Sequence, residues 1–468
     1  AYKKGALNTL DNNENPLRLL PQADAVLRSA ECAGLIAEYG DALCAIAVKN
    51  ALCAMRQSIL NNGCADTSVL GVVNAAGLLL KSPVSPCPVI NATGIALHTN
   101  LGRAPLAEEA RAAVQNACGY TDIEYDLTSG KRGERGKEAN ALLCRLTGCE
   151  AALCVNNNAA ALLLALTVMC EGKDVVVSRG ELVEIGGSFR VSDIMQLCGG
   201  KIHEVGTTNR THLSDYEKAV SNAGVILKVH TSNFLQLGFT CEASISQLAE
   251  LAHHNRLPLL ADLGSGALLP ESEYPFSEPC VPMGVKSGAD VLVFSGDKLL
   301  GGPQCGIICG KKEWIEKMRT YPLARALRID KLSLAALTAT LRLYQSPKAA
   351  KERVPVLHML CQGEEELLQK ANALKNALAK RTQYECDIMA TMRPVGGGSV
   401  PGVELKSYAV AITVRDADAF AAALRLAKTP IIAIIRDSRV VMDIACMSLE
   451  EIENAAVIIS DLDSSAYL

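Results

Sequence analysis

The sequence predicts an α/β protein with a mostly parallel central sheet, preceded by a helical domain and followed by a smaller α+β domain. At 468 residues the chain is too long for one ordinary core, so two or three domains are expected. Between about residues 89 and 340, short apolar or β-branched runs alternate with helical stretches. This alternation is typical of βαβ units whose parallel sheet is covered on both faces.

The predicted N-terminal domain is helical. Pro21 can begin a helix that continues with apolar residues at helical spacing, and residues 41–60 predict a second helix. The stretch KSPVSPCP, residues 81–88, holds three prolines and indicates a linker. The predicted division is a helical domain over 1–68, a linker over 69–88, a large domain over 89–344 and a small α+β domain over 345–468.

Seven runs predict the strands of the large domain: 151–155, 174–178, 201–205, 225–230, 257–262, 290–295 and 306–310. In the small domain, helices are predicted over 345–385, followed by strands near 405–413, 430–435 and 439–444. Ligands of open α/β sheets bind beyond the carboxyl ends of the strands. Asn156, Asp262 and the segment 295–298 all follow predicted strands, so we expect the site there.

Composition excludes several classes of protein. Apolar runs such as 159–170 are too short to cross a bilayer, and the N-terminus shows no signal-peptide core, so we expect a cytoplasmic protein without a membrane partner. The 18 cysteines include no CxxC pair or zinc-like spacing, so no metal site is expected. A net charge of −4 argues against nucleic acid as a partner, and the N-terminal region is not basic.

A lysine and an aspartate form the first candidate site. Lys298 stands between a short strand and a glycine loop in FSGDKLLGGPQCG, and Asp262 ends a strand one helix earlier in ADLGSG. A pyridoxal phosphate enzyme needs this pair, because the lysine holds the cofactor aldehyde and the aspartate keeps the pyridine nitrogen protonated. Either residue alone would have a simpler explanation, since a lysine after a strand is usually solvated.

The cofactor phosphate also needs a binding site. Asn156, Asn157 and Asn158 lie between a strand and a strong helix former, where backbone N–H groups attract anions, and Ser295 could add a hydroxyl. An ordinary helix N-cap is the alternative for the asparagines. His230, at the end of VILKVH, and Asn233 are candidates for contact with the ring or its 3-oxygen. A packed strand-end histidine is equally consistent.

Three arginines form the second candidate site. Arg103 lies in a turn within TNLGRAPL, and Arg325 and Arg328 are three residues apart, on one face if they are helical. Guanidinium groups bind phosphate-like anions through two parallel hydrogen bonds. A charged helix surface is the alternative for Arg325 and Arg328.

Several stretches together resemble the bacterial selenocysteine synthases, the L-seryl-tRNA(Sec) selenium transferases. The resemblance extends from about Pro16 to PVGGGSVPGVEL, nearly the whole chain. Its most specific stretches are VINATGIALHTNLGRAPL, EYDLTSGKRGER, VNNNAAALLLAL, VSRGELVEIGGSFRV, EVGTTNRTHLSDY, DLGSGAL, FSGDKLLGGPQCG and PLARALRIDK.

This resemblance implies a pyridoxal phosphate enzyme of the aspartate-aminotransferase-like fold type I, with Lys298 as the Schiff-base residue. It implies seryl-tRNA(Sec) as substrate, loss of the α-proton and then of the hydroxyl, and addition of selenium from selenophosphate. Freed Lys298 would act as general base. Arg103, Arg325 and Arg328 would line the active site. It further implies a ring-shaped homodecamer built of dimers, and an N-terminal domain that contacts the tRNA body.

Other functions stay open at this point. A pyridoxal phosphate lyase or transferase could act on a free small molecule, and a tRNA-binding protein could keep the fold without catalysis. The presence of the N-terminal domain argues against the first, and the intact lysine, aspartate and arginines argue against the second. Asp297 adjoins Lys298, but on a strand its side chain would point the other way, so a structural role is expected.

Overall fold

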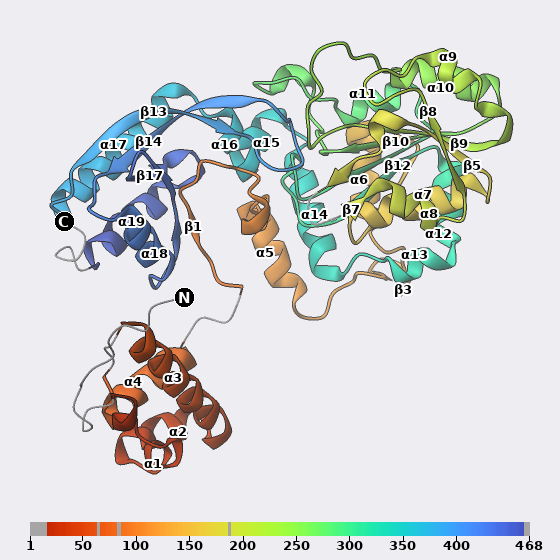
Figure 1. Ribbon diagram of the computed structural model, residues 1–468. Coiled ribbons are helices and arrows are strands. Elements are labelled where there is room, and N and C mark those ends of the chain that lie inside the picture. Colours follow the sequence, from red (N-terminus) through yellow and green to blue (C-terminus); the bar gives the residue numbers. More distant parts are fainter. Residues whose placement is uncertain (1–15, 63–65, 82–85, 186–188, 463–468) are drawn as a thin grey trace, which may run out of the picture. The chain divides into compact units, whose positions relative to one another are not determined.

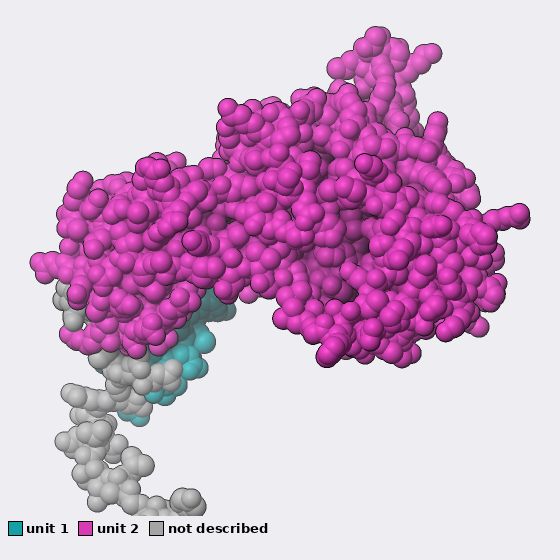
Figure 2. Space-filling view, turned by 90° about the horizontal axis from the view of Figure 1, so that it is seen from above, with its two compact units in different colours: residues 1–88 teal, residues 89–468 magenta. Residues whose placement is uncertain are grey.

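The computed structural model describes residues 16–62, 66–81, 86–185 and 189–462 of the chain. These residues form two compact units, 1–88 and 89–468, which Figure 2 colours separately. The boundary after Pro88 coincides with the predicted start of the large domain.

The first unit is helical (Figure 1). Its elements are η1 Pro16–Leu19, α1 Ala23–Leu27, η2 Ala30–Cys32, α2 Ala33–Tyr39, α3 Asp41–Asn62 and α4 Val69–Lys81. Gly40, with φ of 80°, ends α2 and allows the chain to turn into α3. Val26, Val48, Ala51 and Val72 pack into the core of the unit. The predicted linker is therefore wrong over 69–81, because α4 buries apolar residues against α3.

Helix α3 is an exception to the expectation that the apolar runs of this chain are too short to cross a bilayer. Its residues Asp41–Leu60 are long and apolar enough to cross a bilayer by length and composition alone, which the sequence analysis overlooked. About a third of that window is buried within the unit, 33%. Val48 and Ala51 lie in the core that α3 forms with α4. This packing accounts for part of the apolar character of α3, which is therefore weak evidence for a membrane span.

The second unit contains the predicted large sheet. Its seven strands are β4 Ala151–Val155, β5 Asp174–Ser178, β8 Lys201–Val205, β9 Ala223–Val229, β10 Leu259–Gly264, β11 Val291–Ser295 and β12 Gly306–Gly310. Their order is β4-β12-β11-β10-β9-β5-β8, and only β12 runs antiparallel to its neighbours. All seven predicted strands are confirmed. Every residue of β9, β10 and β11 is buried, which explains their continuous apolar sequence.

Helices cover both faces of this sheet (Figure 1). Alternate residues of the strands enter two separate cores, as Ile226 and Leu227 of β9 show. The helices of this region are α5 Glu108–Ala117, α6 Lys137–Thr147, α7 Asn158–Cys170, α8 Val191–Leu197, α9 Leu213–Glu217, α10 Ile245–His254, α11 Val281–Lys286, α12 Lys312–Thr320, α13 Pro322–Ala326 and α14 Lys331–Leu343. Two short hairpins add β2 Tyr125–Asp126 with β3 Lys131–Arg132, and β6 Glu184–Ile185 with β7 Phe189–Arg190.

The C-terminal part has its own antiparallel sheet, in the order β13-β14-β17-β16. Its elements are α15 Pro347–Arg353, α16 Pro355–Cys361, α17 Glu364–Arg381, β13 Cys386–Pro394, β14 Glu404–Ile412, α18 Ala417–Arg425, β15 Ile431–Ile432, β16 Ile434–Arg436, β17 Arg439–Asp443 and α19 Leu449–Ser460. The three predicted strand regions are present, whereas β13 was not predicted. Strand β1, Ile90–Asn91, pairs with β15, so the first residues assigned to the large domain pack in this smaller core.

Candidate functional site

Lys298 lies directly beyond β11 and points into the protein. The residue is only 5% exposed. A tight turn holds it, because the Gly301 N–H donates to the Lys298 carbonyl at 2.9 Å and the Gly302 N–H donates to the Gly296 carbonyl at 2.8 Å. A side chain at Gly296 would collide with the sulfur of Cys305, so the turn requires glycine there. The buried lysine is therefore fixed by local backbone geometry.

Asp262 lies at the end of the neighbouring strand, β10, which pairs in parallel with β11. Its Oδ1 accepts hydrogen bonds from Asn158 Nδ2 at 3.0 Å and from the Gly264 N–H at 3.1 Å. Burial raises the pKa of Asp262, while Asn158 and the charge of Lys298 oppose that rise. Burial lowers the pKa of the Lys298 ammonium, and Asp262 opposes this change. The structure thus brings the predicted lysine and aspartate within electrostatic range.

The surroundings of this pair suit a polar ligand. A Cβ built on Gly398 would lie 3.0 Å from Lys298 Nζ, and one on Gly264 would lie 3.9 Å away, so glycines give access to the amine. Among the residues described, three buried polar atoms near these elements have no hydrogen-bond partner: Asn158 Oδ1, His230 Nε2 and Ser265 Oγ. Buried polar groups are normally paired, so partners supplied by a ligand would complete the site.

The three asparagines before α7 have three different environments. Asn157 is the N-cap, since its side chain accepts the Ala160 N–H at 2.8 Å. Asn158 turns towards Asp262, and exposed Asn156 donates its N–H to the Leu327 carbonyl at 3.0 Å. Ser295 is buried at the end of β11. The α7 N-terminus and Ser295 therefore lie at the same edge of the sheet, but the asparagine side chains do not converge on one point.

The two residues predicted to contact the cofactor ring, His230 and Asn233, have different surroundings. His230 directly follows β9, and its backbone N–H donates to the Asp262 carbonyl at 2.8 Å. Asn233 instead donates from Nδ2 to the carbonyl of Glu184 at 2.9 Å, which ties it to strand β6. A buried acid that the sequence analysis did not identify, Glu278, lies with Oε1 3.4 Å from His230 Nε2. A single glutamate in a loop has no sequence pattern that could have indicated this contact.

Arg103 and Asp297 form an ion pair next to the lysine. Arg103 Nη1 lies 2.7 Å from Asp297 Oδ2, and Arg103 adopts a left-handed backbone conformation with φ of 63°. The Asp297 side chain is 9% exposed and that of Arg103 is 34% exposed, so the arginine retains access to solvent. The positive charge of Arg103 contributes to the lowered pKa of Lys298. Asp297 therefore holds an arginine beside the candidate site.

Arg325 and Arg328 do not lie in one helix, so the condition for a shared helix face is not met. Helix α13 ends at Ala326, and the backbone of Arg328 forms a bridge with Val155 at the end of β4. This bridge to β4 places Arg328 outside the helix. Arg328 Nη1 donates to Glu124 Oε1 at 3.1 Å, whereas exposed Arg325 has no ion pair within the part of the chain that the structure describes.

Glu124 also forms ion pairs with two further arginines, which were not among the predicted site residues. Arg132 and Arg135 lie 3.0 and 3.3 Å from its carboxylate, in addition to Arg328. Burial alone would raise the pKa of Glu124, but hydrogen bonds from Arg135 and Arg132 lower it below its usual range. Three guanidinium groups share one carboxylate, which leaves an excess of positive charge at the edge of the sheet where β4 ends.

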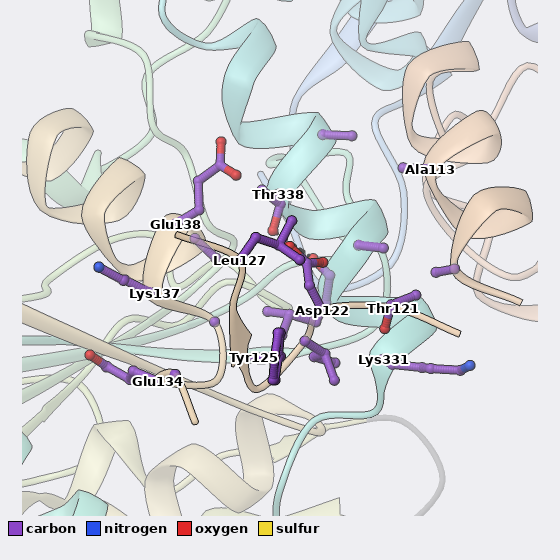
Figure 3. Close-up of a pocket in the computed structure, with 18 of the residues that line it drawn as sticks. Ala113, Thr121, Asp122, Tyr125, Leu127, Glu134, Lys137, Glu138, Lys331 and Thr338 are labelled. Carbon is purple, nitrogen blue, oxygen red and sulfur yellow. Dashed lines mark hydrogen bonds between the residues drawn. The ribbon is translucent and has the colours of Figure 1, made fainter. Parts of the chain in front are cut away.

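Two cavities differ in their relation to this site. A cavity of about 1260 Å³ lies between α5, α6, α14 and the segment 120–134 (Figure 3), and none of the predicted site residues lines it. A second cavity, of about 550 Å³, is lined by His230, by Glu278 and by residues 400–403 of the small domain. The smaller cavity therefore adjoins the Lys298 site.

The fold and the site together define a class of protein. Six parallel strands and one antiparallel strand carry a buried lysine beyond β11 and an aspartate at the end of β10. This is the aspartate-aminotransferase-like fold type I of pyridoxal phosphate enzymes, as the sequence predicted. The solved structure of D-glucosaminate-6-phosphate ammonia-lyase is similar in fold, with a TM-score of 0.57 and 20% identity over 80% of this chain and 96% of that one.

Comparison with known sequences identifies the family. The profile of the L-seryl-tRNA selenium transferase family matches residues 89–448. The L-seryl-tRNA(Sec) selenium transferase of Hyphomonas neptunium is 46% identical over 440 residues, covering 92% of this chain and 95% of its own length. That of Yersinia pestis (strain Pestoides F) is 44% identical over 464 residues, covering 96% and 98%. The chain belongs to the L-seryl-tRNA selenium transferase family.

The glycine at 398 provides a test of the site geometry. We expect Gly398→Ala to weaken cofactor binding roughly five- to tenfold, because the new methyl group forces Lys298 from its rotamer at a cost of about 1 kcal/mol. Gly148→Ala is the matched control, since φ is 78° there and 79° at Gly398 but nothing lies within 4 Å. Cofactor titration by absorbance, with thermal unfolding of both variants, checks this. Equal losses of cofactor affinity in the two variants would contradict it.

Proposed function

We propose that this chain converts seryl-tRNA(Sec) to selenocysteyl-tRNA(Sec), using pyridoxal 5′-phosphate and selenium from selenophosphate. The observation that carries the proposal is a buried lysine beside a buried aspartate in a chain that matches the selenium transferases over nearly its full length. The reaction would be elimination of water from the seryl group followed by addition of selenium. The names of the relatives support the substrate, and the site residues support the chemistry.

The residues present fit the cofactor. Lys298 would bind its aldehyde, Asp262 would face its ring nitrogen, and the N-terminus of α7 together with Ser295 would receive its phosphate. The imidazole of His230, which directly follows β9 beside Asp262, would give the ring or its oxygen a polar neighbour. When bound, pyridoxal phosphate supplies an electron sink for negative charge at the substrate α-carbon.

The chain itself supplies proton transfer and charge. Because burial lowers the pKa of Lys298, a larger share of its amine is unprotonated and able to accept the substrate α-proton. Asp262 is held by Asn158 and the Gly264 N–H, so its carboxylate has a fixed orientation in which it would receive the ring nitrogen of the cofactor. The surrounding elements exclude water, because Asp262 and Lys298 are 6% and 5% exposed.

The arginines suit an anionic selenium donor. Arg103 is fixed by Asp297 next to Lys298, and Arg325 is exposed without an ion pair to any described residue. Arg328 shares Glu124 with two other arginines, so one carboxylate neutralises only part of the local positive charge. Guanidinium groups can bind two oxygens of a phosphate group at once, which fits selenophosphate.

We further propose a cytoplasmic homo-oligomer, a ring-shaped decamer of dimers, with the helical first unit contacting the tRNA body. The cavity of about 1260 Å³ supports self-association, because the apolar side chains Tyr120 and Leu127 in its lining are 109% and 75% exposed. The first unit supports a binding role. It is compact by itself and packs a core of its own.

The central test is conversion of seryl-tRNA(Sec) by the purified protein with selenophosphate. We expect formation of selenocysteyl-tRNA, and its loss in Lys298→Ala, because that variant lacks the amine that binds the cofactor. Borohydride reduction should attach the cofactor to Lys298 in the unchanged protein and in Lys351→Ala, a half-buried lysine outside the site. A cofactor–lysine adduct in Lys298→Ala would show that the lysine is assigned wrongly. Turnover of free serine instead of the tRNA ester would favour the small-molecule alternative.

Single substitutions Arg103→Lys, Arg325→Lys and Arg328→Lys test the anion site. Each keeps the charge but loses the planar pair of donors, so we expect selenium transfer to fall about 100-fold or more while the cofactor stays bound. Steady-state transfer rates and cofactor absorbance measure the two effects. Arg439→Lys is the control, because this arginine pairs with Asp387 in the small domain. Unchanged rates in all three site variants would refute the assignment.

Removal of the first unit tests its role in RNA binding. A shortened chain beginning at Ser82 should keep the cofactor, because Lys298 and Asp262 belong to the second unit. It should lose most of its affinity for the tRNA, measured at one fixed salt concentration. The lost contribution should depend little on salt, since the unit carries few basic residues. Unchanged affinity would move the RNA site to the second unit.

A further inference from the structure

Glu278 is a buried carboxylate that the proposed reaction does not use. It lies in the loop between β10 and α11 and is only 3% exposed. Its Oε1 is 3.4 Å from Nε2 of His230, and neither atom makes a hydrogen bond in the described parts of the chain. A buried carboxylate without a partner is unfavourable, so an N–H from the imidazole is the interaction that the geometry offers to Oε1.

His230 connects this carboxylate to the reacting groups. Its backbone N–H donates to the carbonyl of Asp262 at 2.8 Å, which fixes the start of its side chain at the end of β9. The charges of the four groups also interact. His230 opposes the raised pKa of Asp262, and Glu278 opposes the lowered pKa of Lys298. The pair of Glu278 and His230 therefore lies within electrostatic range of both residues proposed to hold the cofactor.

The same pair borders the cavity of about 550 Å³. His230 and Glu278 both line it, opposite residues 400–403 of the small domain. The other two acids in its wall, Glu181 and Glu242, are neutralised by Lys228, whose Nζ lies 2.7 and 2.8 Å from them. Within the described residues, Glu278 is thus the carboxylate of this cavity that no lysine or arginine pairs. A ligand that enters the cavity meets the imidazole held by Glu278.

We propose that Glu278 is a positioning residue: it accepts the Nε2 proton of His230 in a hydrogen bond and so fixes the tautomer and orientation of the imidazole. Nδ1, the second nitrogen of the neutral ring, then has no proton and acts as a hydrogen-bond acceptor for a neighbouring group. Carboxylates orient imidazoles in this way in many catalytic and metal sites. The contribution to turnover rests on the proposed function, whereas the hydrogen bond itself does not.

Histidine-selective ¹⁵N NMR of the full-length protein without cofactor tests the hydrogen bond. The seven histidines give few signals, and His230→Gln identifies the signal of His230. We expect Nε2 of His230 to carry the proton at neutral pH, and Glu278→Gln to shift this signal. Glu271→Gln, an exposed acid of the same loop, should leave it unchanged. An unprotonated Nε2 in the unchanged protein overturns the proposal without any variant.

Kinetics of the holoenzyme test the consequence. We expect Glu278→Gln to lower kcat roughly 10- to 100-fold while KM for seryl-tRNA stays within about twofold, since an oriented imidazole affects the reaction more than tRNA binding. Glu278→Asp should recover part of the rate, because it restores a carboxylate. A wild-type kcat in Glu278→Gln, with an unchanged His230 signal, reduces Glu278 to a packing residue. Absence of selenium transfer in the unchanged protein would count against the proposed function, while the NMR result would still decide the role of Glu278.

Discussion

The burial of Lys298 and Asp262 side by side is the constraint on which the rest of the second unit depends. Each charge loses most of its hydration, and burial shifts both pKa values towards the neutral forms. Each also opposes the shift of the other, and Asp262 receives two hydrogen bonds besides. Two charges this deeply buried stay in place only if the surrounding structure fixes them. The sheet provides that rigidity, because β10 and β11 are central strands without an exposed residue.

Close backbone packing around the two strand ends follows from this constraint. A side chain at Gly266 would meet the Ser295 carbonyl, and one at Gly306 would meet the backbone of Asn157. Chain segments can therefore approach the Lys298 turn closely enough to exclude water. Gly398 brings the small domain to the same lysine, so the site is assembled from both halves of the second unit. The rigid sheet and the close packing at the glycines thus both keep Lys298 and Asp262 in place and away from water.

The sequence predicted the large sheet well and the positions of individual charges less well. Short continuous apolar runs bounded by turn residues indicated the buried parallel strands. The linker was predicted over 69–88 because residues 81–88 hold three prolines. The apolar periodicity of 69–81 indicates a helix instead, and α4 occupies these residues. The sequence left open whether Arg325 and Arg328 share a helix, because the pairing of Arg328 with Val155 is a long-range contact. Glu278 could not be found, because only the folded chain brings it to His230.

The order of the strands also arranges charge across the carboxyl edge of the sheet. At the β4 side, Arg328 joins two other arginines on Glu124, which leaves positive charge in excess. Beyond β9, on the other side of Lys298, the acids of the smaller cavity include Glu278. An anion would be attracted to the first side and a substrate ammonium to the second, because fields in a partly buried cleft are weakly screened. The reaction proposed for this chain brings an anionic selenium donor and the amino group of the seryl ester to Lys298. The order of the strands places this lysine between the two sides.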